Sequence, residues 1–211
     1  MSAQGEAVAP ELRGVWYACG KLVDTLPGHD YVYSGPMATY CAWHRPMAVY
    51  SPAANRTYFC YGNAQNAPTV SYYDHNLRRF AYPQVVGENP DGDAHRNPTL
   101  QVDDEGYIYI FYGAHGHPTK TLRSRRPHEI RAWEERAPLP DEHTSYPQCW
   151  ILRPGEIFVS YRQAPGWQFA RSRDGALSWD PPQNICAFGC PDEAHGCAEG
   201  SIYGITWAER G

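Results

Sequence analysis

A repeat of about fifty residues runs through the middle of the chain, and it limits the possible folds more than any other feature. Its three copies contain HRPMAVY and RTYFCYG (44–62), HRNPTLQV and GYIYIFYG (95–113), and SYPQCWIL and GEIFVSYR (145–162). In each copy a proline precedes an apolar segment, and an aromatic-rich segment then ends in Tyr-Gly or Tyr-Arg. Repetition at this period predicts a modular fold in which each copy is one structural unit.

Within each copy the pattern of side chains predicts β-strands. Apolar and polar residues alternate in YIYIFY (107–112) and EIFVSY (156–161), as expected of strands, and no segment shows a helical period. The chain has 19 Gly, 19 Pro and 14% aromatic residues, which favours many short strands joined by turns. We therefore expect an all-β fold, a β-propeller with one four-stranded blade per copy. A β-sandwich with accidental internal similarity is the alternative.

The segment SRDGALSW (172–179) resembles the Asp-box turn of sialidase-type propellers, Ser-x-Asp-Gly-Gly-x-Thr-Trp, with Ala176 in place of the second glycine. That turn joins the third and fourth strands of a blade. We expect Asp174 to accept hydrogen bonds from turn amides, Gly175 to supply a permissive backbone and Trp179 to pack between blades. The motif predicts sialidase-like four-stranded blades, and it predicts no activity.

The repeats predict one incomplete propeller domain. Counting copies at this period divides the chain (1–211) into a leader at 1–42, blades at about 43–86, 94–137 and 143–184, and the start of a further blade at about 199–211. Because closed propellers have about four to eight blades, the remaining blades must come from a longer chain or from self-association. Both explanations stay open, and the open strand edge predicts that the isolated chain associates with itself.

Charge and hydropathy exclude several partners. A net charge of −5 at pH 7 leaves no extended basic surface for nucleic acid. No run reaches the roughly 18 apolar residues of a membrane span, and the N-terminal residues lack the pattern of a signal peptide. We therefore expect no nucleic acid and no membrane as partner, while the localisation stays open.

The repeat also predicts where polar side chains gather. In a four-stranded blade the chain enters the innermost strand at one end, and the loop between the second and third strands returns to that end. Residues before the repeated proline and after the repeated Tyr-Gly or Tyr-Arg should therefore converge: His44, His95, Asn97, His115, Tyr146 and Arg162. His75 and His128 lie on turns between the third and fourth strands, so they should lie at the opposite end.

Two imidazoles, a phenol and a guanidinium suit β-elimination from a uronic acid. That reaction needs a group that neutralises the uronate carboxylate, a base for the α-proton and an acid for the leaving oxygen. Glycosidases usually present paired carboxylates instead. Here the acids near the predicted site lie in loops before the strands: Asp91, Asp93, Asp141 and Glu142. The residues favour a lyase that requires no redox cofactor.

The segments DAHRNPTL, YIYIFYGAHG, SYPQCWIL and IFVSYR resemble the BNR-type propeller family that includes the ulvan lyases, which act on sulfated rhamnose–uronate polymers. The resemblance covers about residues 40–185. It implies a seven-bladed propeller, of which three to four blades would be present here, and an acidic polysaccharide as partner. It also implies secreted or periplasmic proteins that are longer than this chain.

By motif, the catalytic residues of that family fall on His95, His115, Tyr146 and Arg162. The resemblance implies that one histidine and the tyrosine transfer protons, while the arginine and the other histidine hold the uronate carboxylate. Relatives of the fold include rhamnose–glucuronate hydrolases and propellers without known activity. Three functions therefore stay open: a polysaccharide lyase, a glycoside hydrolase and a non-catalytic carbohydrate-binding propeller.

Three further residues are candidates for substrate binding, namely His44, Asn97 and His117. His44 aligns with His95 but could instead cap its strand, and His117, next to Pro118, could be a solvated turn residue.

The segment CAFGCPDEAHGC (186–197) could hold a structural zinc ion. Cys186, Cys190, His195 and Cys197 offer enough soft ligands for a tetrahedral site. Their spacing matches no standard zinc finger or ribbon, so free or inter-blade cysteines are the alternative.

Overall fold

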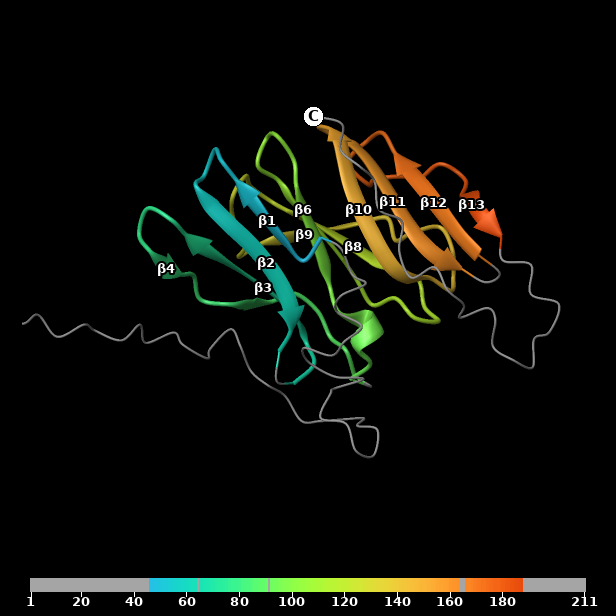
Figure 1. The fold of residues 1–211 in the computed structure, drawn as a ribbon, viewed down its shortest axis with the longest axis horizontal. Helices are drawn as coiled ribbons and strands as arrows, with labels where there is room; N and C mark the ends of the chain where they lie inside the picture. The colour runs from blue at the N-terminus through green and yellow to red at the C-terminus, as the bar shows by residue number, and fades with distance from the viewer. Residues whose placement is uncertain (1–45, 64, 91, 164–165, 188–211) are drawn as a thin grey trace, which may run out of the picture.

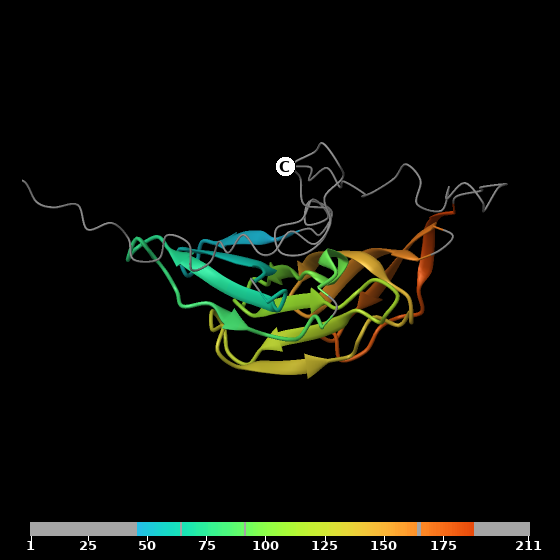
Figure 2. The same ribbon diagram turned by 90° about the horizontal axis from the view of Figure 1, so that it is seen from below.

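The computed structural model describes residues 46–63, 65–90, 92–163 and 166–187. Its strands form three antiparallel sheets that lie side by side in chain order (Figure 1). Seen from below, the colours again pass from cyan at one side of the molecule to orange at the other (Figure 2). Neighbouring repeats are therefore neighbours in space. The predicted leader at 1–42, His44 and the predicted further blade at 199–211 lie outside the described residues.

The first sheet contains the strands of the first repeat. Its order is β1 (Ala48–Ser51), β2 (Arg56–Gly62), β3 (Pro68–Asp74) and β4 (Arg79–Phe80), and β5 (Gln84–Val85) also pairs with β3. The prediction of a single fourth strand is therefore wrong for this blade, because the two short strands β4 and β5 both pair with β3. Pro83 lies between them, and it has no N–H with which to continue a ladder.

The second and third sheets each have four strands in sequential order. The second consists of β6 (Thr99–Val102), β7 (Ile108–Tyr112), β8 (Lys120–Ser124) and β9 (Trp133–Arg136). The third consists of β10 (Ser145–Arg153), β11 (Glu156–Gln163), β12 (Gly166–Ser172) and β13 (Gln183–Ala187). Their arrangement is that of propeller blades, as the repeat predicted. Among the described residues, no helix has the length and apolar character to cross a membrane.

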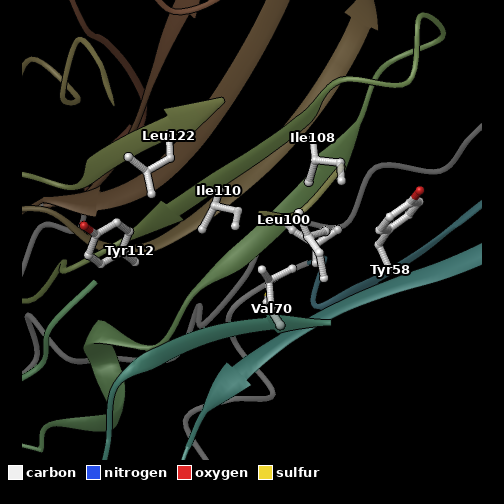
Figure 3. Packing of buried hydrophobic residues seen from close by; sticks show 9 residues of the cluster. Tyr58, Val70, Leu100, Ile108, Ile110, Tyr112 and Leu122 are labelled. Carbon is white, nitrogen blue, oxygen red and sulfur yellow. The ribbon is translucent and has the colours of Figure 1, made fainter. Parts of the chain in front are cut away.

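The core between the first two sheets is formed by apolar residues from both (Figure 3). Its labelled members are Tyr58, Val70, Leu100, Ile108, Ile110, Tyr112 and Leu122. Complete burial of a Val, Leu or Ile side chain stabilises the folded state by about 1.5–3 kcal/mol. This cluster therefore stabilises the packing of the first blade on the second. The innermost strands β1 and β10 both contact β6, which keeps the three blades close at their inner edges.

A second core joins the second and third sheets, and it explains the sequence of β7. Tyr109 and Phe111 pack there with residues of β11, whereas Ile108 and Ile110 face the first sheet. Every residue of β7 is therefore buried, although apolar and more polar residues alternate in its sequence. The reason is that the middle blade has a neighbour on each side.

The Asp-box turn has the expected hydrogen bonds. The Asp174 carboxylate accepts a hydrogen bond from the Ser178 amide at 2.9 Å and another from the Ser178 hydroxyl at 2.6 Å. Gly175 and Ala176 both have positive φ, 71° and 64°, which explains why the motif usually has two glycines here. Trp179 packs on the second core, and its indole N–H donates to the Ala137 carbonyl at 2.9 Å.

Candidate functional site

The chain enters the second sheet through a single-turn 3₁₀-helix, η2 (Ala94–Arg96), which holds His95 in place. The Asp93 carboxylate accepts a hydrogen bond from the His95 amide at 2.9 Å, as an Asx turn does. The Asp93 carbonyl accepts two more, from the Arg96 amide at 3.1 Å and from the Asn89 side chain at 2.9 Å. Local sequence therefore fixes both Asp93 and His95 just before β6.

His115 lies in the loop after β7, in a backbone conformation that non-glycine residues rarely adopt. Its φ is 76°, between Gly113 at 82° and Gly116 at 73°. A side chain in this region costs roughly 1–2 kcal/mol, so surrounding contacts must hold it there. The His115 amide donates to the Thr144 carbonyl at 2.5 Å, and His117 forms a β-bridge with Thr144. The start of the third blade thus positions a residue of the second.

A β-bulge at the start of β10 positions Tyr146. Tyr146 and Pro147 lie opposite the single Tyr161 of β11, because the register shifts between Ser145 and Gln148. Tyr146 has a φ of 54°, which is unusual for a bulky residue, and its exposure is 1%. Bulges redirect side chains and are frequent beside active sites. The bulge turns Tyr146 out of the regular strand alternation.

The redirected Tyr146 ring joins the second blade to the third. Its centroid lies 5.2 Å from that of the His95 ring, at an interplanar angle of 43°. On the third blade, the Cζ atom of Arg162 lies 4.8 Å from the Tyr146 ring centroid, within the range of a cation–π contact. Tyr146 therefore touches both a histidine and an arginine.

His95 and His115 meet although a whole hairpin separates them in sequence. Their rings stack with centroids 3.9 Å apart and planes 22° apart. One Asp93 oxygen lies 2.6 Å from Nδ1 of His95, and the other is hydrogen-bonded to Nδ1 of His115. Side-chain exposure rises from 9% at His95 to 23% at Asp93 and 40% at His115. We refer to Asp93, His95, His115, Tyr146 and Arg162 together as the site cluster.

Two acids near the cluster, Asp93 and Asp141, are hydrogen-bonded to protein groups, and in Asp93 these bonds lower the pKa. Burial alone would raise the pKa of Asp93, but hydrogen bonds from His115, His95 and the His95 amide hold that pKa well below its usual range. The Asp141 carboxylate accepts a hydrogen bond from the Tyr161 hydroxyl. Burial, together with the Asp141 charge, raises the pKa of Tyr161 well above its usual value. Both carboxylates therefore already have partners.

The same three side chains are a candidate metal-binding group. Asp93, His95 and His115 each offer a ligand atom, and these atoms lie within 4.8 Å of one another. Two imidazoles and a carboxylate match the ligand types of catalytic zinc sites. Each Nδ1 atom instead makes a direct hydrogen bond to the carboxylate. The predicted zinc site at Cys186, Cys190, His195 and Cys197 lies outside the described residues, apart from the backbone of Cys186.

The other residues predicted for this end of the blades contact neighbouring segments. Asn97 is 2% exposed and lies against the end of β2: a Cβ atom added to Gly62 would come within 2.4 Å of Asn97 Oδ1. The His117 side chain is exposed, and its backbone pairs with Thr144. Asn97 therefore packs at the seam between the first two blades, while His117 lies at the edge of the site cluster.

His75 and His128 lie at the opposite end of the strands, as the repeat predicted. His75 Nε2 is 2.8 Å from the Thr57 hydroxyl, near the first residue of β2. The His128 amide donates to the Gly106 carbonyl at 2.7 Å, just before β7 begins. Neither histidine belongs to the site cluster.

Two residues of the site were missed by sequence reasoning. Asp93 was set aside as an acid in a loop, although its place two residues before His95 is a signal for an Asx turn. Thr144 is completely buried, and it holds the loop that carries His115. Nothing in the sequence marks Thr144, because its partners come from another blade.

Together, fold and site define a β-propeller of four- and five-stranded antiparallel blades, with polar side chains of neighbouring blades gathered at one end of the strands. Comparison with known proteins makes this assignment more specific. The model of a family described as "BNR repeat-containing family member" matches residues 56–179, and the chain belongs to that family.

Curated relatives with similar sequences are ulvan lyases. The ulvan lyase of Alteromonas sp. (strain LOR) is 28% identical over 152 residues, covering 60% of this chain and 31% of the relative. That of Nonlabens ulvanivorans is 27% identical over 153 residues, covering 60% of this chain and 32% of the relative. The chain thus spans about a third of the length of these relatives.

Solved structures support the fold. A structure described as a new family of polysaccharide lyase, PL25 ulvan lyase, matches with a TM-score of 0.60 and 24% identity, covering 69% of this chain and 38% of that chain. A second structure of that family, bound to -[GlcA(1-4)Rha3S]-, has the same TM-score and coverage at 23% identity. At this sequence identity, the structural similarity shows the fold alone.

Proposed function

We propose that the chain carries the catalytic residues of a polysaccharide lyase that cleaves a uronate-containing, ulvan-like rhamnose–uronate polymer by β-elimination. The observation that carries the proposal is the continuous contact of His115 with His95, of His95 with Tyr146 and of Tyr146 with Arg162. The similarity to ulvan lyases supports the choice of an acidic polysaccharide as substrate.

The residue types of the site cluster provide every group that the elimination requires. The Arg162 guanidinium can pair with the uronate carboxylate, which makes the proton on the adjacent carbon more acidic. A histidine then removes that proton, the C–H electrons form the new carbon–carbon double bond, and the bond to the glycosidic oxygen breaks. Tyr146 can return a proton to that oxygen, so charge and atoms balance. The products are one unsaturated uronate end and one ordinary sugar end.

The carboxylates of the site favour elimination over hydrolysis. A glycosidase needs two carboxyl groups placed for acid and base or nucleophile roles, about 5–9.5 Å apart. Asp93 is hydrogen-bonded to two imidazoles, and Asp141 is hydrogen-bonded to Tyr161. Both groups are already engaged with protein donors. A rhamnose–glucuronate hydrolase is therefore the alternative function with less support.

The test is to incubate the chain with ulvan and to follow ultraviolet absorbance, because elimination creates a conjugated uronate and hydrolysis does not. We expect absorbance to rise together with the number of reducing ends. Ulvan whose carboxylates have been chemically reduced should not be cleaved. New reducing ends without absorbance would instead identify a hydrolase. Binding without either signal would identify a carbohydrate-binding propeller.

A further inference from the structure

Asp93 contacts both histidines of the site cluster, and it uses a different oxygen for each. Oδ1 lies 2.6 Å from Nδ1 of His95, and Oδ2 is hydrogen-bonded to Nδ1 of His115. The two rings stack face to face 3.9 Å apart, so one carboxylate spans the same edge of both. Such a bridge orients two imidazoles with a single side chain.

The chemistry of the carboxylate decides which ring nitrogens carry protons. An ionised carboxylate can only accept hydrogen bonds, so each nitrogen that contacts it must be an N–H donor. In a neutral imidazole only one nitrogen carries a proton. With Nδ1 protonated on both His95 and His115, Nε2 of each ring keeps its lone pair. Both rings are then ready to accept a proton at Nε2.

Asp93 is itself held in place by the backbone around it. Its Oδ1 also accepts the His95 amide at 2.9 Å. Its carbonyl accepts the Arg96 amide at 3.1 Å and the buried Asn89 side chain at 2.9 Å. A carboxylate fixed at both its backbone and its side chain can hold the rings without rearrangement.

From this geometry we propose that Asp93 is a positioning residue that keeps both His95 and His115 in the Nδ1–H tautomer, so that each presents Nε2 as a proton acceptor. The His115 side chain is 40% exposed and that of His95 is 9% exposed, so His115 is the ring that a substrate reaches more easily. The tautomer assignment stands on the contacts alone, whereas its catalytic consequence rests on the proposed lyase function.

Nitrogen-15 NMR of the full chain with labelled histidine tests the tautomers directly. At a pH where the imidazoles are neutral, we expect His95 and His115 to be among the histidines that show the shifts and couplings of the Nδ1–H form. His95→Gln and His115→Gln should each remove one of these signals, which assigns them. Signals of the Nε2–H form at both positions would overturn the proposal, whether or not the chain cleaves a polysaccharide.

The variant Asp93→Asn tests whether the Asp93 carboxylate is the group that orients both rings. An amide of the same shape accepts through its oxygen but donates through its nitrogen, so only one ring can keep an Nδ1–H partner. We expect one histidine to switch to the Nε2–H form, and turnover of a cleaved polymer to fall about 100-fold or more, with a much smaller change in KM. The matched control Asp104→Asn, at an exposed turn remote from the cluster, should change neither.

Two outcomes would overturn the proposal in favour of other roles. If Asp93→Asn kept both histidines in the Nδ1–H form, another group would be orienting the rings. If the purified protein contained one equivalent of zinc that Asp93→Asn lost, the three residues would be metal ligands rather than a hydrogen-bonded group. Wild-type Nδ1–H signals in a chain without lyase activity would leave the positioning proposal intact and remove the proposed function.

Discussion

The two ends of the strands carry similar residues but assemble them differently. Each end has histidines and an aspartate with a lowered pKa, Asp93 at one end and Asp174 at the other. The Asp174 pKa is lowered by the Ser178 hydroxyl and amide, four residues away. Asp93 depends in part on His115, which lies 22 residues further along the chain. The Asp-box end is therefore a local turn, whereas the site cluster exists only when the hairpins and blades have packed.

This comparison teaches that the proposed catalytic residues and the turns that stabilise the blades lie at opposite ends of the strands. At the turn end, side chains satisfy the backbone of their own loop. At the site end, His115 and Tyr146 adopt costly positive φ values. The ring of Tyr146 and the backbone amide of His115 each make a contact that crosses between the second and third blades. Strain held by long-range contacts is typical of functional sites. Substitutions at the site end should therefore lower turnover, whereas substitutions at the turn end should lower the free energy of unfolding.

The largest effect is expected for Tyr146→Phe at the site end. The substitution removes the hydroxyl that we propose as the proton donor, but it keeps the ring that contacts His95 and Arg162. We expect turnover on the cleaved polymer to fall by about 10²–10⁴-fold with little change in KM. Steady-state kinetics measure both values. Unchanged turnover would show that the proton for the leaving oxygen comes from another group.

A smaller loss is expected for Arg162→Lys. The lysine keeps a positive charge but loses the planar two-point contact with a carboxylate. We expect kcat/KM to fall roughly 30-fold, about 2 kcal/mol in transition-state terms, with KM and kcat both affected. A fall confined to uronate-containing substrates would strengthen the assignment. An equal fall for carboxyl-reduced polymers would contradict it.

At the turn end, Asp174→Ala should affect stability and leave the chemistry unchanged. It removes the acceptor for the Ser178 amide and hydroxyl, so we expect the free energy of unfolding to fall by about 1–2 kcal/mol. Denaturant unfolding provides the measurement. At a temperature where the variant is folded, turnover should match that of the wild type. A specific loss of turnover would remove the distinction between the two ends.

The contribution of Asp174 should also depend on pH. Because its folded-state pKa is lowered, chiefly by the Ser178 hydroxyl, ionisation favours the folded state. The contribution is present above the unfolded-state pKa, near 4, and is lost as pH falls through the folded-state pKa. The difference in unfolding free energy between wild type and Asp174→Asn should therefore be larger at pH 7 than at pH 3. A difference independent of pH would contradict this assignment.

The smallest effect is expected for His75→Ala. The side chain is exposed and contacts Thr57, Tyr50 and Tyr73 within its own sheet. We expect turnover within about two-fold of wild type and a stability change of about 0.5 kcal/mol or less. Loss of turnover in this variant, together with normal turnover in His115→Ala, would reverse the assignment of the two ends.

Sequence reasoning succeeded wherever periodicity was sufficient. The repeat placed the three sheets, and the Asp-box motif placed Asp174 and Trp179 with their contacts. The position of each loop within a blade brought His95 and His115 to the same end. These features follow from spacing along one chain, since equivalent positions of a repeat recur at equivalent places in space.

The remaining features depend on contacts between distant segments. The bulge that turns Tyr146 toward His95 has no clear signal apart from Pro147, and the burial of both faces of β7 requires two neighbouring blades. The bridging role of Asp93 also needs His115, which periodicity places at the same end but not within hydrogen-bonding distance. Spacing predicts which residues are near one another, and packing decides which of them touch.

The close approach of Gly62 to Asn97 means that the first blade supports the position of a site cluster built from residues of the other two blades. A single methyl group at Gly62 would act as a wedge against Asn97, the residue that follows η2. A displacement of Asn97 would occur next to η2, which carries His95. A side chain at Gly62 would therefore act on the site cluster through packing, because Gly62 meets Asn97 rather than a member of the cluster.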